Sequence, residues 1–390
     1  MLRENAETIR DKLLREVMIR RTRCEIEQYY KEDMERQGLT FPKVGSPEKI
    51  IYTFDEYTDS TFTETVAIIK DFKYSRYMPL IYLKPEIQKR PDIAVMVVGQ
   101  RNMGGFMKGI LVKRLESSFY AFRMTLERFI SSYEKFITMA KSGKLYISKK
   151  IDVYDLLDDG DVDKLMYYVE QNDVMEFNTT DFTPKFLRDL EGDLSSLKSL
   201  RDMWGIINTD PKLDEFKKNL TTDENMIGKK IIVFTESKET AHYLYENLQD
   251  IYGSRVIYFS GQSSQQLKVQ IEDSFNPKNK SKNNDKFDLL ITTDVLAEGI
   301  NLHRANVLVN YDLPWNPTRI MQRVGRINRV GSEFDRIFVY NFFPTAQTAE
   351  HLPLEERILE KLQAFHDTLG EDIKYLSDEE EISSKNCFRI

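Results

Sequence analysis

Five short apolar runs alternate with amphipathic segments in the second half of this chain, and this alternation constrains the fold more than any other feature. The runs are rich in Val, Ile, Tyr and Phe, and they comprise residues 230–234, 255–259, 287–293, 306–312 and 336–342. Segments 239–249 and 264–275 separate the first three runs and have the apolar spacing of helices. Strands that alternate with helices form parallel sheets that are covered on both faces. The sequence therefore predicts an α/β domain with a parallel sheet and helices on both faces.

The first half of the chain is predicted to be mostly helical. Apolar residues recur every three or four positions over 106–142, which predicts one long helix with Gly143 as its C-cap. Residues 1–35 have similar spacing, and the prolines and Gly-Ser pair of 41–47 predict a break. Residues 151–200 are acidic, and we interpret them as a helical insertion with a solvated face rather than as a cluster of catalytic carboxylates.

These patterns divide the chain into four parts. A chain of 390 residues is too long for one ordinary core, so several domains are expected. The expected parts are a helical bridging region at 1–145, an acidic helical insertion at 146–206, the parallel-sheet lobe at 207–350, and a C-terminal helix with a charged tail at 351–390.

Composition narrows the class of protein. No apolar run approaches the roughly 18 residues that span a bilayer, and the charged N-terminus is not typical of a secretory signal. The two cysteines, Cys24 and Cys387, fit no disulfide or metal-ligand pattern, so we expect a cytoplasmic protein without a metal site of its own. The net charge of -7 argues against binding nucleic acid by overall charge. Any contact with a polyanion is therefore expected at a local basic surface.

Polar and small residues follow the predicted strands. Thr235 and Gly261 follow the first two strands, and Thr292 lies at the end of the third. In an open parallel sheet, ligands bind at the carboxyl ends of the strands. Hydroxyl groups, and backbone N–H groups beside glycine, can approach a phosphate chain closely. The sequence therefore predicts that this edge of the sheet binds phosphate groups.

Three arginines follow this edge within the run QRVGRINRVG. Asn316 is a good N-cap and Pro317 a good first residue for a helix there. At 3.6 residues per turn, four polar residues of such a helix share an arc of about 80–100°, with Arg323 to one side. These four are Arg319, Gln322, Arg326 and Arg329. An arginine stripe can be merely solvated, but guanidinium groups beside a hydroxyl-rich sheet edge suit the spread charge of a transferring phosphoryl group.

Residues 292–331, TTDVLAEGINLHRANVLVNYDLPWNPTRIMQRVGRINRVG, resemble motifs V and VI of superfamily 2 helicases. The Trp-Asn-Pro before QRxGRxxR, and the Gly-x-Asn-Leu of motif V, are similar to the Swi/Snf-type branch, with bacterial RapA-like ATPases as the nearest resemblance. KKIIVFTES (229–237) resembles motif IV, and YFSGQ (258–262) resembles the segment after it. The resemblance implies that the predicted α/β domain is the second RecA-like lobe of such a protein.

Further upstream the resemblance is weaker. Residues 210–220 resemble the helix that opens the second lobe, and residues 15–30 and 111–129 resemble helical segments that bridge the two lobes. The N-terminal part would then be a mostly helical bridging and insertion region.

The resemblance also implies a role for each matching residue. Residues with a catalytic role toward the γ-phosphate of ATP would be the arginine fingers Arg326 and Arg329, with Gln322 orienting in the same cleft. Residues beside the nucleotide would be Gly299, Asn301 and Gly325. Residues touching a nucleic-acid backbone would be Thr235, Gly261 and Thr292. Glu298 and Asn301 depart from DEAD-box helicases, which have arginine and aspartate there, so duplex DNA is the expected partner rather than an RNA to be unwound.

ATP hydrolysis also needs a glycine-rich loop with a lysine, and an acidic residue that holds Mg²⁺. The sequence has no G-x-x-x-x-G-K-[ST] run, and we interpret Asp55 and Glu56, which follow a strand-like run, as a coincidental acidic pair. ATP and Mg²⁺ are therefore expected to be held mainly by an N-terminal RecA-like lobe of the same protein. These 390 residues alone are expected not to hydrolyse ATP.

Two hypotheses follow from the sequence. The first is the motor lobe of an ATP-dependent DNA helicase or translocase. The second is a degenerate lobe that serves as a DNA-binding or protein-interaction module, and the intact QRxGRxxR run argues against it. A separate enzyme with a complete nucleotide site is disfavoured by the missing phosphate loop.

Overall fold

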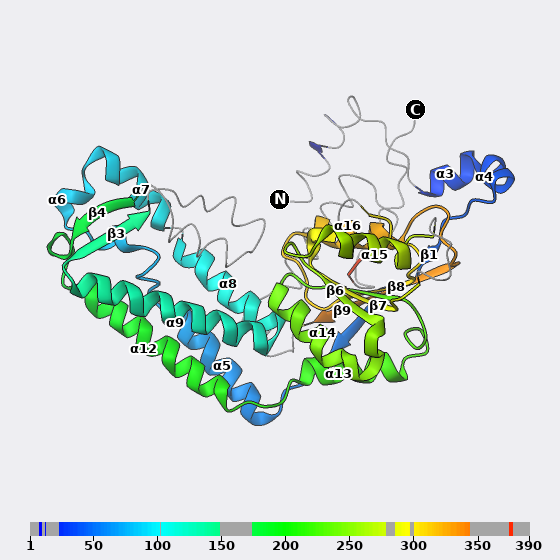
Figure 1. Ribbon diagram of the computed structural model, residues 1–390. Coiled ribbons are helices and arrows are strands. Elements are labelled where there is room, and N and C mark those ends of the chain that lie inside the picture. The colour runs from blue at the N-terminus through cyan, green and yellow to red at the C-terminus, as the bar shows by residue number, and fades with distance from the viewer. Residues whose placement is uncertain are drawn as a thin grey trace. The chain divides into compact units, whose positions relative to one another are not determined.

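The computed structural model describes residues 8–9, 12, 23–101, 103–148, 174–277, 285–296, 300–343 and 374–376. The chain forms two compact units (Figure 1). Unit 1 comprises Met1–Thr53 and Pro211–Ile390, and unit 2 comprises Phe54–Asp210. The boundary expected at 206/207 is close to the observed one, whereas the region expected at 1–145 is divided after Thr53. The N-terminal segment therefore belongs to the same unit as the parallel sheet.

Unit 1 is built on a parallel sheet of seven described strands. Five of them coincide with the predicted runs, namely β5 (Ile231–Phe234), β6 (Val256–Phe259), β7 (Leu289–Thr292), β8 (Val307–Asn310) and β9 (Arg336–Phe343). They pair in the order β9-β8-β5-β7-β6, all in parallel. The predicted α/β fold is confirmed.

Helices cover both faces of this sheet, as predicted (Figure 1). One face carries α13 (Pro211–Thr222) and α14 (Lys238–Tyr252), and the other carries α15 (Gln265–Phe275) and α16 (Pro317–Ile327). Alternate residues of each strand point to opposite faces, so Ile232, Leu290 and Leu308 join the core beneath α15 and α16. Burial on both faces explains why the strands are continuous apolar runs.

Two short N-terminal strands join this sheet; the first was not predicted, and the second lies in the strand-like run that precedes Asp55. β1 (Lys43–Val44) and β2 (Glu48–Ile51) both pair in parallel with β9. β1 lies inside 41–47, which the prolines had marked as a break. Edge strands tolerate neighbouring prolines because they pair on one side only. Upstream of them lie the short helices α3 (Arg23–Tyr29) and α4 (Lys31–Gln37).

Unit 2 is mainly helical. Its helices are α5 (Glu56–Asp71), α6 (Pro85–Gln88), α7 (Pro91–Arg101), α8 (Met103–Ser117), α9 (Phe119–Lys141) and α12 (Lys185–Gly205). An antiparallel pair, β3 (Lys144–Ser148) and β4 (Val174–Asn178), completes it. The Asp55 side chain caps α5 by accepting a hydrogen bond from the N–H of Thr58 at 2.8 Å. This contact gives Asp55 a structural role, in agreement with its interpretation as part of a coincidental pair.

The single helix predicted over 106–142 is wrong, because the structure has two helices there. Ser118 is extended between α8 and α9, and its hydroxyl accepts a hydrogen bond from the N–H of Ala121 at 3.0 Å. The apolar period continues through the break, so periodicity alone did not reveal it. Ser142 is the C-cap of α9, and Gly143 follows it with a φ of 94°, the position just past the helix that favours glycine.

A buried carboxylate connects the helices of unit 2. Asp193 of α12 accepts hydrogen bonds from the N–H of Lys73 (2.9 Å), the N–H and hydroxyl of Ser75 (2.8 and 2.6 Å) and the hydroxyl of Tyr133 (3.0 Å). Burial raises the pKa of Asp193 although these donors act against the rise. Between the two anchored residues, Tyr74 has a φ of 55°, which is unfavourable for a side chain of its size. Asp193 therefore fixes the turn after α5.

The chain leaves unit 1 after Thr53 and re-enters it at Pro211. Just inside the second crossing, the buried ammonium group of Lys212 lies 4.3 Å from the ring centre of Tyr311 and 5.8 Å from that of Tyr52. Such cation–π contacts stabilise a buried ammonium group. The side chains next to the two crossing points therefore lie side by side in unit 1.

Several predicted features lie outside the described residues. These are most of 1–22, residues 149–173 of the acidic insertion, and all of the C-terminal helix and tail (351–390) except 374–376. None of the helices in the described ranges is long and apolar enough to cross a membrane.

Candidate functional site

α16 begins as the sequence predicts. The Asn316 side chain accepts hydrogen bonds from the N–H of Thr318 at 3.1 Å and from its hydroxyl at 2.7 Å, and Pro317 is the first helical residue. The helix ends at Ile327, so Arg329 lies two residues beyond it. The helix follows β8 after a short loop that leaves the carboxyl edge of the sheet.

Arg323 does not face solvent. Its side chain is fully buried, and its guanidinium group donates to both oxygens of Asp294, at 2.6 and 3.0 Å. Its remaining terminal nitrogen donates to the side-chain oxygen of Asn310 at 3.0 Å and to the carbonyl of Asp312 at 3.1 Å. The group also lies 5.3 Å from the ring centre of Phe234. The anion that Arg323 binds is therefore part of the lobe itself.

Opposite effects act on the Asp294 carboxyl. Burial tends to raise its pKa, but the charges and hydrogen bonds of Arg323 and Arg319 outweigh burial and hold the pKa below its usual range. For Arg323, burial tends to lower the pKa, but the charge and hydrogen bonds of Asp294 outweigh burial and raise the pKa above its usual value. Removing one partner of such a buried pair typically costs about 3–5 kcal/mol, because the other charge stays behind unpaired.

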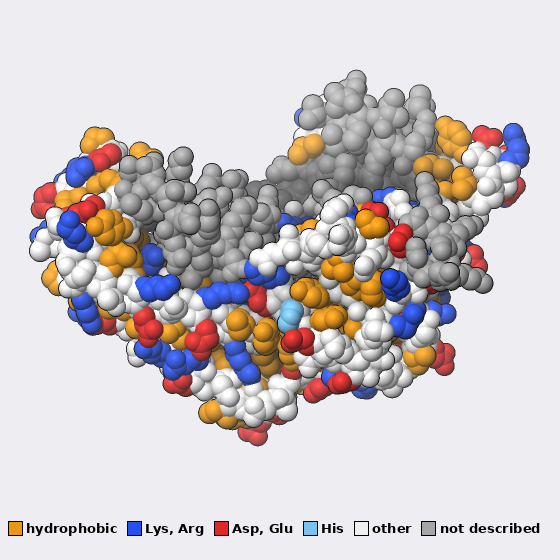
Figure 2. All heavy atoms as spheres, viewed as in Figure 1, with side chains coloured by type: hydrophobic (Ala, Val, Ile, Leu, Met, Phe, Trp, Pro, Cys, Tyr) orange, Lys and Arg blue, Asp and Glu red, His pale blue; other side chains and the backbone are white. Residues whose placement is uncertain are grey.

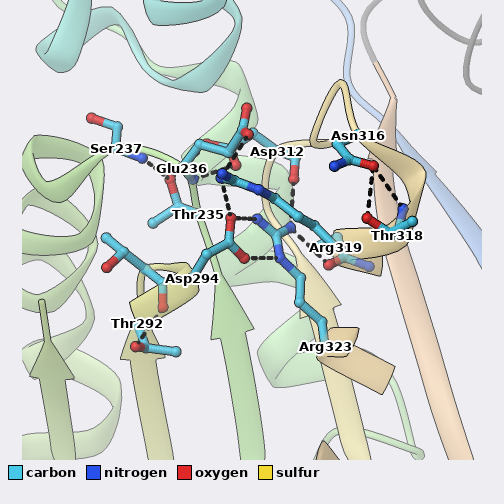
Figure 3. A network of polar contacts seen from close by, with 12 residues as sticks. Thr235, Glu236, Ser237, Thr292, Asp294, Asp312, Asn316, Thr318, Arg319 and Arg323 are labelled. Carbon is cyan, nitrogen blue, oxygen red and sulfur yellow. Dashed lines mark hydrogen bonds and ion pairs between the residues drawn. The ribbon is translucent and has the colours of Figure 1, made fainter. Parts of the chain in front are cut away.

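The remaining contacts at this edge join three strand ends (Figure 3). Arg319 lies one turn before Arg323, 3.3 Å from Asp294 and 3.8 Å from Glu236. Asp312 accepts a hydrogen bond from the Thr235 hydroxyl at 2.6 Å and from the N–H of Glu236 at 2.7 Å. Figure 3 shows the side chains of Arg319 and Arg323 directed toward Asp294. The network thus connects the ends of β5, β7 and β8 with α16.

The proposed arginine fingers have different surroundings from Arg323. Arg326 is half-buried and Gln322 exposed, on other sides of α16. Arg329 is half-buried, and its guanidinium group donates to the carbonyl of Gly325 at 3.2 Å and to the side-chain oxygen of Asn301. Both of these acceptors are neutral, so they orient the guanidinium group without neutralising its charge.

The residues expected to touch nucleic acid fall into two groups. Thr235 and Thr292 are fully buried, and their hydroxyls are bonded within the protein, to Asp312 and to the carbonyl of Thr293 (2.9 Å). Gly261 is exposed after β6, and a Cβ atom built on it would have only ordinary contact with Val295, at 3.6 Å. Gly261 is thus the one of the three whose surface a ligand can reach directly in this conformation.

Sequence reasoning missed Asp294, Asn310 and Asp312, which hold α16 in place. Gly299, expected beside the nucleotide, lies outside the described residues. A signal for Asp294 was present, since it is an acidic residue two positions after a strand and therefore at the carboxyl edge. The guanidinium group of Arg329 is a donor that suits phosphate oxygens, and the two oxygens that orient it are neutral, so the residues present fit the terminal phosphate of a nucleotide.

Comparison with known proteins identifies relatives of the part of the chain that forms the parallel sheet and α16. Residues 211–331 match the model of the helicase conserved C-terminal domain. The chain is similar to the uncharacterized ATP-dependent helicase YqhH of Bacillus subtilis, with 37% identity over 145 residues, covering 37% of this chain and 24% of that protein. It is also similar to the ATP-dependent RNA helicase sub2 of Aspergillus terreus, with 30% identity over 125 residues, covering 31% of this chain and 27% of that protein. The chain thus spans about a quarter of the length of these relatives.

Among solved structures, the C-terminal part of the Fun30 ATPase domain aligns over 80% of this chain and 90% of that chain, at 13% identity and a TM-score of 0.37. A similarity of this degree does not bear on function. The matched domain contains β5 to β8 together with α16, and it ends at Gly331, just after the arginines. Residues 211–331 therefore form a domain that matches the helicase conserved C-terminal domain, within a RecA-like parallel sheet that helices cover on both faces.

Proposed function

We propose that unit 1 is the second motor lobe of an ATP-dependent DNA translocase of the Swi/Snf type. In this proposal Arg326 and Arg329 extend to the γ-phosphate of an ATP that the first RecA-like lobe holds with Mg²⁺, and Gln322 lies in the same cleft beside Gly299, Asn301 and Gly325. The arginines contribute only when the lobes close, which couples hydrolysis to movement.

The observation that carries this proposal is the contrast between two arginines of one motif. Arg323 is buried and matched by the carboxylate of Asp294. Arg329 is held by two neutral oxygens, from Asn301 and Gly325, so these contacts leave its positive charge uncompensated. An oriented guanidinium group of this kind stabilises the charge that develops on a transferring phosphoryl group.

The proposed binding of nucleic acid rests on the exposed carboxyl edge of the sheet around Gly261. On the face shown in Figure 2, basic and acidic side chains are interspersed over the described surface. Together with the net charge of -7, this pattern favours local contacts with the phosphate backbone over a broad basic field. In this proposal, Thr235 and Thr292 act by shaping the edge, through their buried hydroxyls.

Duplex DNA is the proposed track because the sequence has the Trp-Asn-Pro and Gly-x-Asn-Leu runs of the Swi/Snf branch. A helicase of this type moves along the duplex without necessarily separating its strands. Stimulation of hydrolysis by duplex DNA, compared with single-stranded DNA and with RNA duplex, tests this choice. Equal or greater stimulation by RNA would refute it.

The finger assignment is tested by Arg326→Ala and Arg329→Ala in the full-length protein, with Arg255→Ala as a control. Arg255 pairs with Asp288 at the opposite edge of the sheet, remote from the proposed cleft. We expect each finger variant to lose about 10³-fold or more in kcat, with an unchanged melting temperature and little change in ATP binding. The control should keep its kcat. Normal turnover by Arg326→Ala would rule out the assignment.

A further inference from the structure

α16 is attached to the residues around the end of β7 at two places. Near its beginning, Arg319 and Arg323 both contact Asp294, which lies two residues after β7. Near its end, the N–H of Leu302 donates to the carbonyl of Arg326 at 3.3 Å, and Arg329 donates to Asn301. Residues that follow β7 therefore hold α16 both before the proposed fingers and at the fingers themselves.

The Asp294 contact fixes more than the location of the helix. Arg319 and Arg323 are four residues apart, so they lie on one face in successive turns. Arg323 binds both carboxylate oxygens, and a fork of this kind permits only one relative orientation of the two planar groups. Since the Arg323 side chain is fully buried, water cannot replace Asp294 as its partner.

The orientation matters because successive residues on a helix are separated by about 100°. With Arg323 directed into the sheet edge, Gln322 is exposed and Arg326 half-buried on other sides of the helix. A small rotation of α16 would displace the Arg326 guanidinium group by several times the tolerance of a catalytic contact, which is about 0.5 Å.

We propose that Asp294 is a positioning residue for ATP hydrolysis, which sets the rotation of α16 about its axis and thereby directs Arg326 toward the γ-phosphate. The inference rests on the proposed function, since it assumes that Arg326 acts in hydrolysis. In this inference Asp294 does not itself have to touch the nucleotide. It acts through Arg323, with Arg319 as a second and looser contact.

A residue with a merely structural role would also lower stability when replaced, so the test needs a matched control. Asp288 provides it, because it precedes the same strand that Asp294 follows. Asp288 accepts bidentate hydrogen bonds from Arg255, and these bonds hold the pKa of Asp288 below its usual range. Both aspartates thus bind one arginine through two oxygens, but at opposite ends of β7.

The experiment compares Asp294→Asn and Asp288→Asn in the full-length protein, below the melting temperature of each variant. For Asp294→Asn we expect kcat to fall by about 100-fold, the loss that a 1 Å misplacement can cause, with KM for ATP changed little. Affinity for ADP with aluminium fluoride, which mimics the transferring phosphoryl group, should fall with kcat, whereas affinity for ADP should not. Asp288→Asn should lose stability and keep all four quantities unchanged.

Asp294→Glu, which retains the carboxylate, should recover part of kcat. If Asp294→Asn does not fold, Arg319→Gln removes the looser contact with Asp294, together with the 3.8 Å contact with Glu236, and a fall in kcat without a matching rise in KM is again expected. Equal kcat in the Asp294→Asn and Asp288→Asn variants would overturn the inference. If Arg326→Ala abolishes hydrolysis while Asp294→Asn does not, only the positioning role fails, whereas normal hydrolysis by Arg326→Ala contradicts the proposed function itself.

Discussion

Arg329 and Asn301 are hydrogen-bonded to each other, although 28 residues separate them in the chain. The contact joins the end of motif VI to the end of motif V, and its acceptor is a neutral amide oxygen. We expect Asn301→Ala to lower kcat by about 10-fold, because a hydrogen bond to a charged group is worth roughly 1.5–3 kcal/mol and this one orients a proposed finger. Steady-state hydrolysis in the full-length protein measures the change.

Asn301→Asp is the informative partner for that variant. Aspartate has nearly the same shape and retains the acceptor, but its negative charge would compensate the charge of Arg329, so kcat should fall at least as far as in the alanine variant. A kcat within about threefold of the original would mean that the position of the acceptor, rather than its neutrality, is the decisive property.

The depressed pKa of Asp294 makes part of the stability of unit 1 dependent on pH. The folded-state pKa lies below the unfolded value of about 3.9, so the stabilisation is fully present above that value and is lost as the pH falls through the folded pKa. Asp294→Asn should therefore lower the free energy of unfolding most at neutral pH, and the difference from the original protein should shrink below about pH 4. Urea unfolding at pH 7, 5 and 3.5 measures it.

Asp288→Asn serves as the comparison for the pH series as well. The pKa of Asp288 is also lowered, chiefly by its hydrogen bond from Arg255, but its side chain is 32% exposed. Solvent screening makes exposed pairs worth less. A pH-dependent loss in Asp288→Asn as large as that in Asp294→Asn would mean that burial is not what makes the Asp294 contact strong.

Replacing Asp193 should destabilise unit 2 in particular. Asp193→Ala leaves two buried or half-buried N–H groups and two hydroxyls without their acceptor, and the expected loss is about 3–5 kcal/mol in the free energy of unfolding. Asp189→Ala, in the same helix, removes a single 3.0 Å hydrogen bond from Tyr82 and should cost about 1 kcal/mol. Hydrogen exchange of the amides of α5 and α12 localises the effect, and equal losses in the two variants would contradict it.

Gly261 provides a test of the proposed nucleic-acid edge. The residue is exposed, its φ is compatible with a side chain, and a Cβ atom would fit beside Val295. Gly261→Ala should therefore fold normally but keep a phosphate chain at a greater distance from the backbone, lowering affinity for duplex DNA by about 5–10-fold. Fluorescence anisotropy at two salt concentrations measures it. Gly192→Ala, on an exposed position of α12, is the control and should bind DNA normally.

The sequence predicted those features that depend on local pattern. The five strands of the sheet could be identified because both of their faces are buried, which makes each of them a continuous apolar run. The start of α16 could be identified because Asn316 and Pro317 have distinct preferences for the first positions of a helix. The break at Ser118 was missed because the apolar residues on both sides of it face the same core and keep the same period.

The inward direction of Arg323 shows what the sequence could not provide. Helix geometry placed Arg323 to one side of the stripe, but its partner Asp294, which Arg319 also contacts, lies 29 residues away and becomes a neighbour only when β7 and β8 end at the same edge. The pairing therefore depends on the order of strands in the sheet. The same holds for Asp312 and Thr235, which are 77 residues apart.

The proximity of Tyr52 and Lys212 has a consequence for the evolution of this architecture. A domain whose two ends meet at neighbouring points of its host can be acquired, exchanged or lost without rearranging the host's strands. Replacing residues 54–210 with a short linker from Thr53 to Pro211 should accordingly leave a parallel-sheet lobe that folds. The helical unit between these points has the chain connection of an inserted domain.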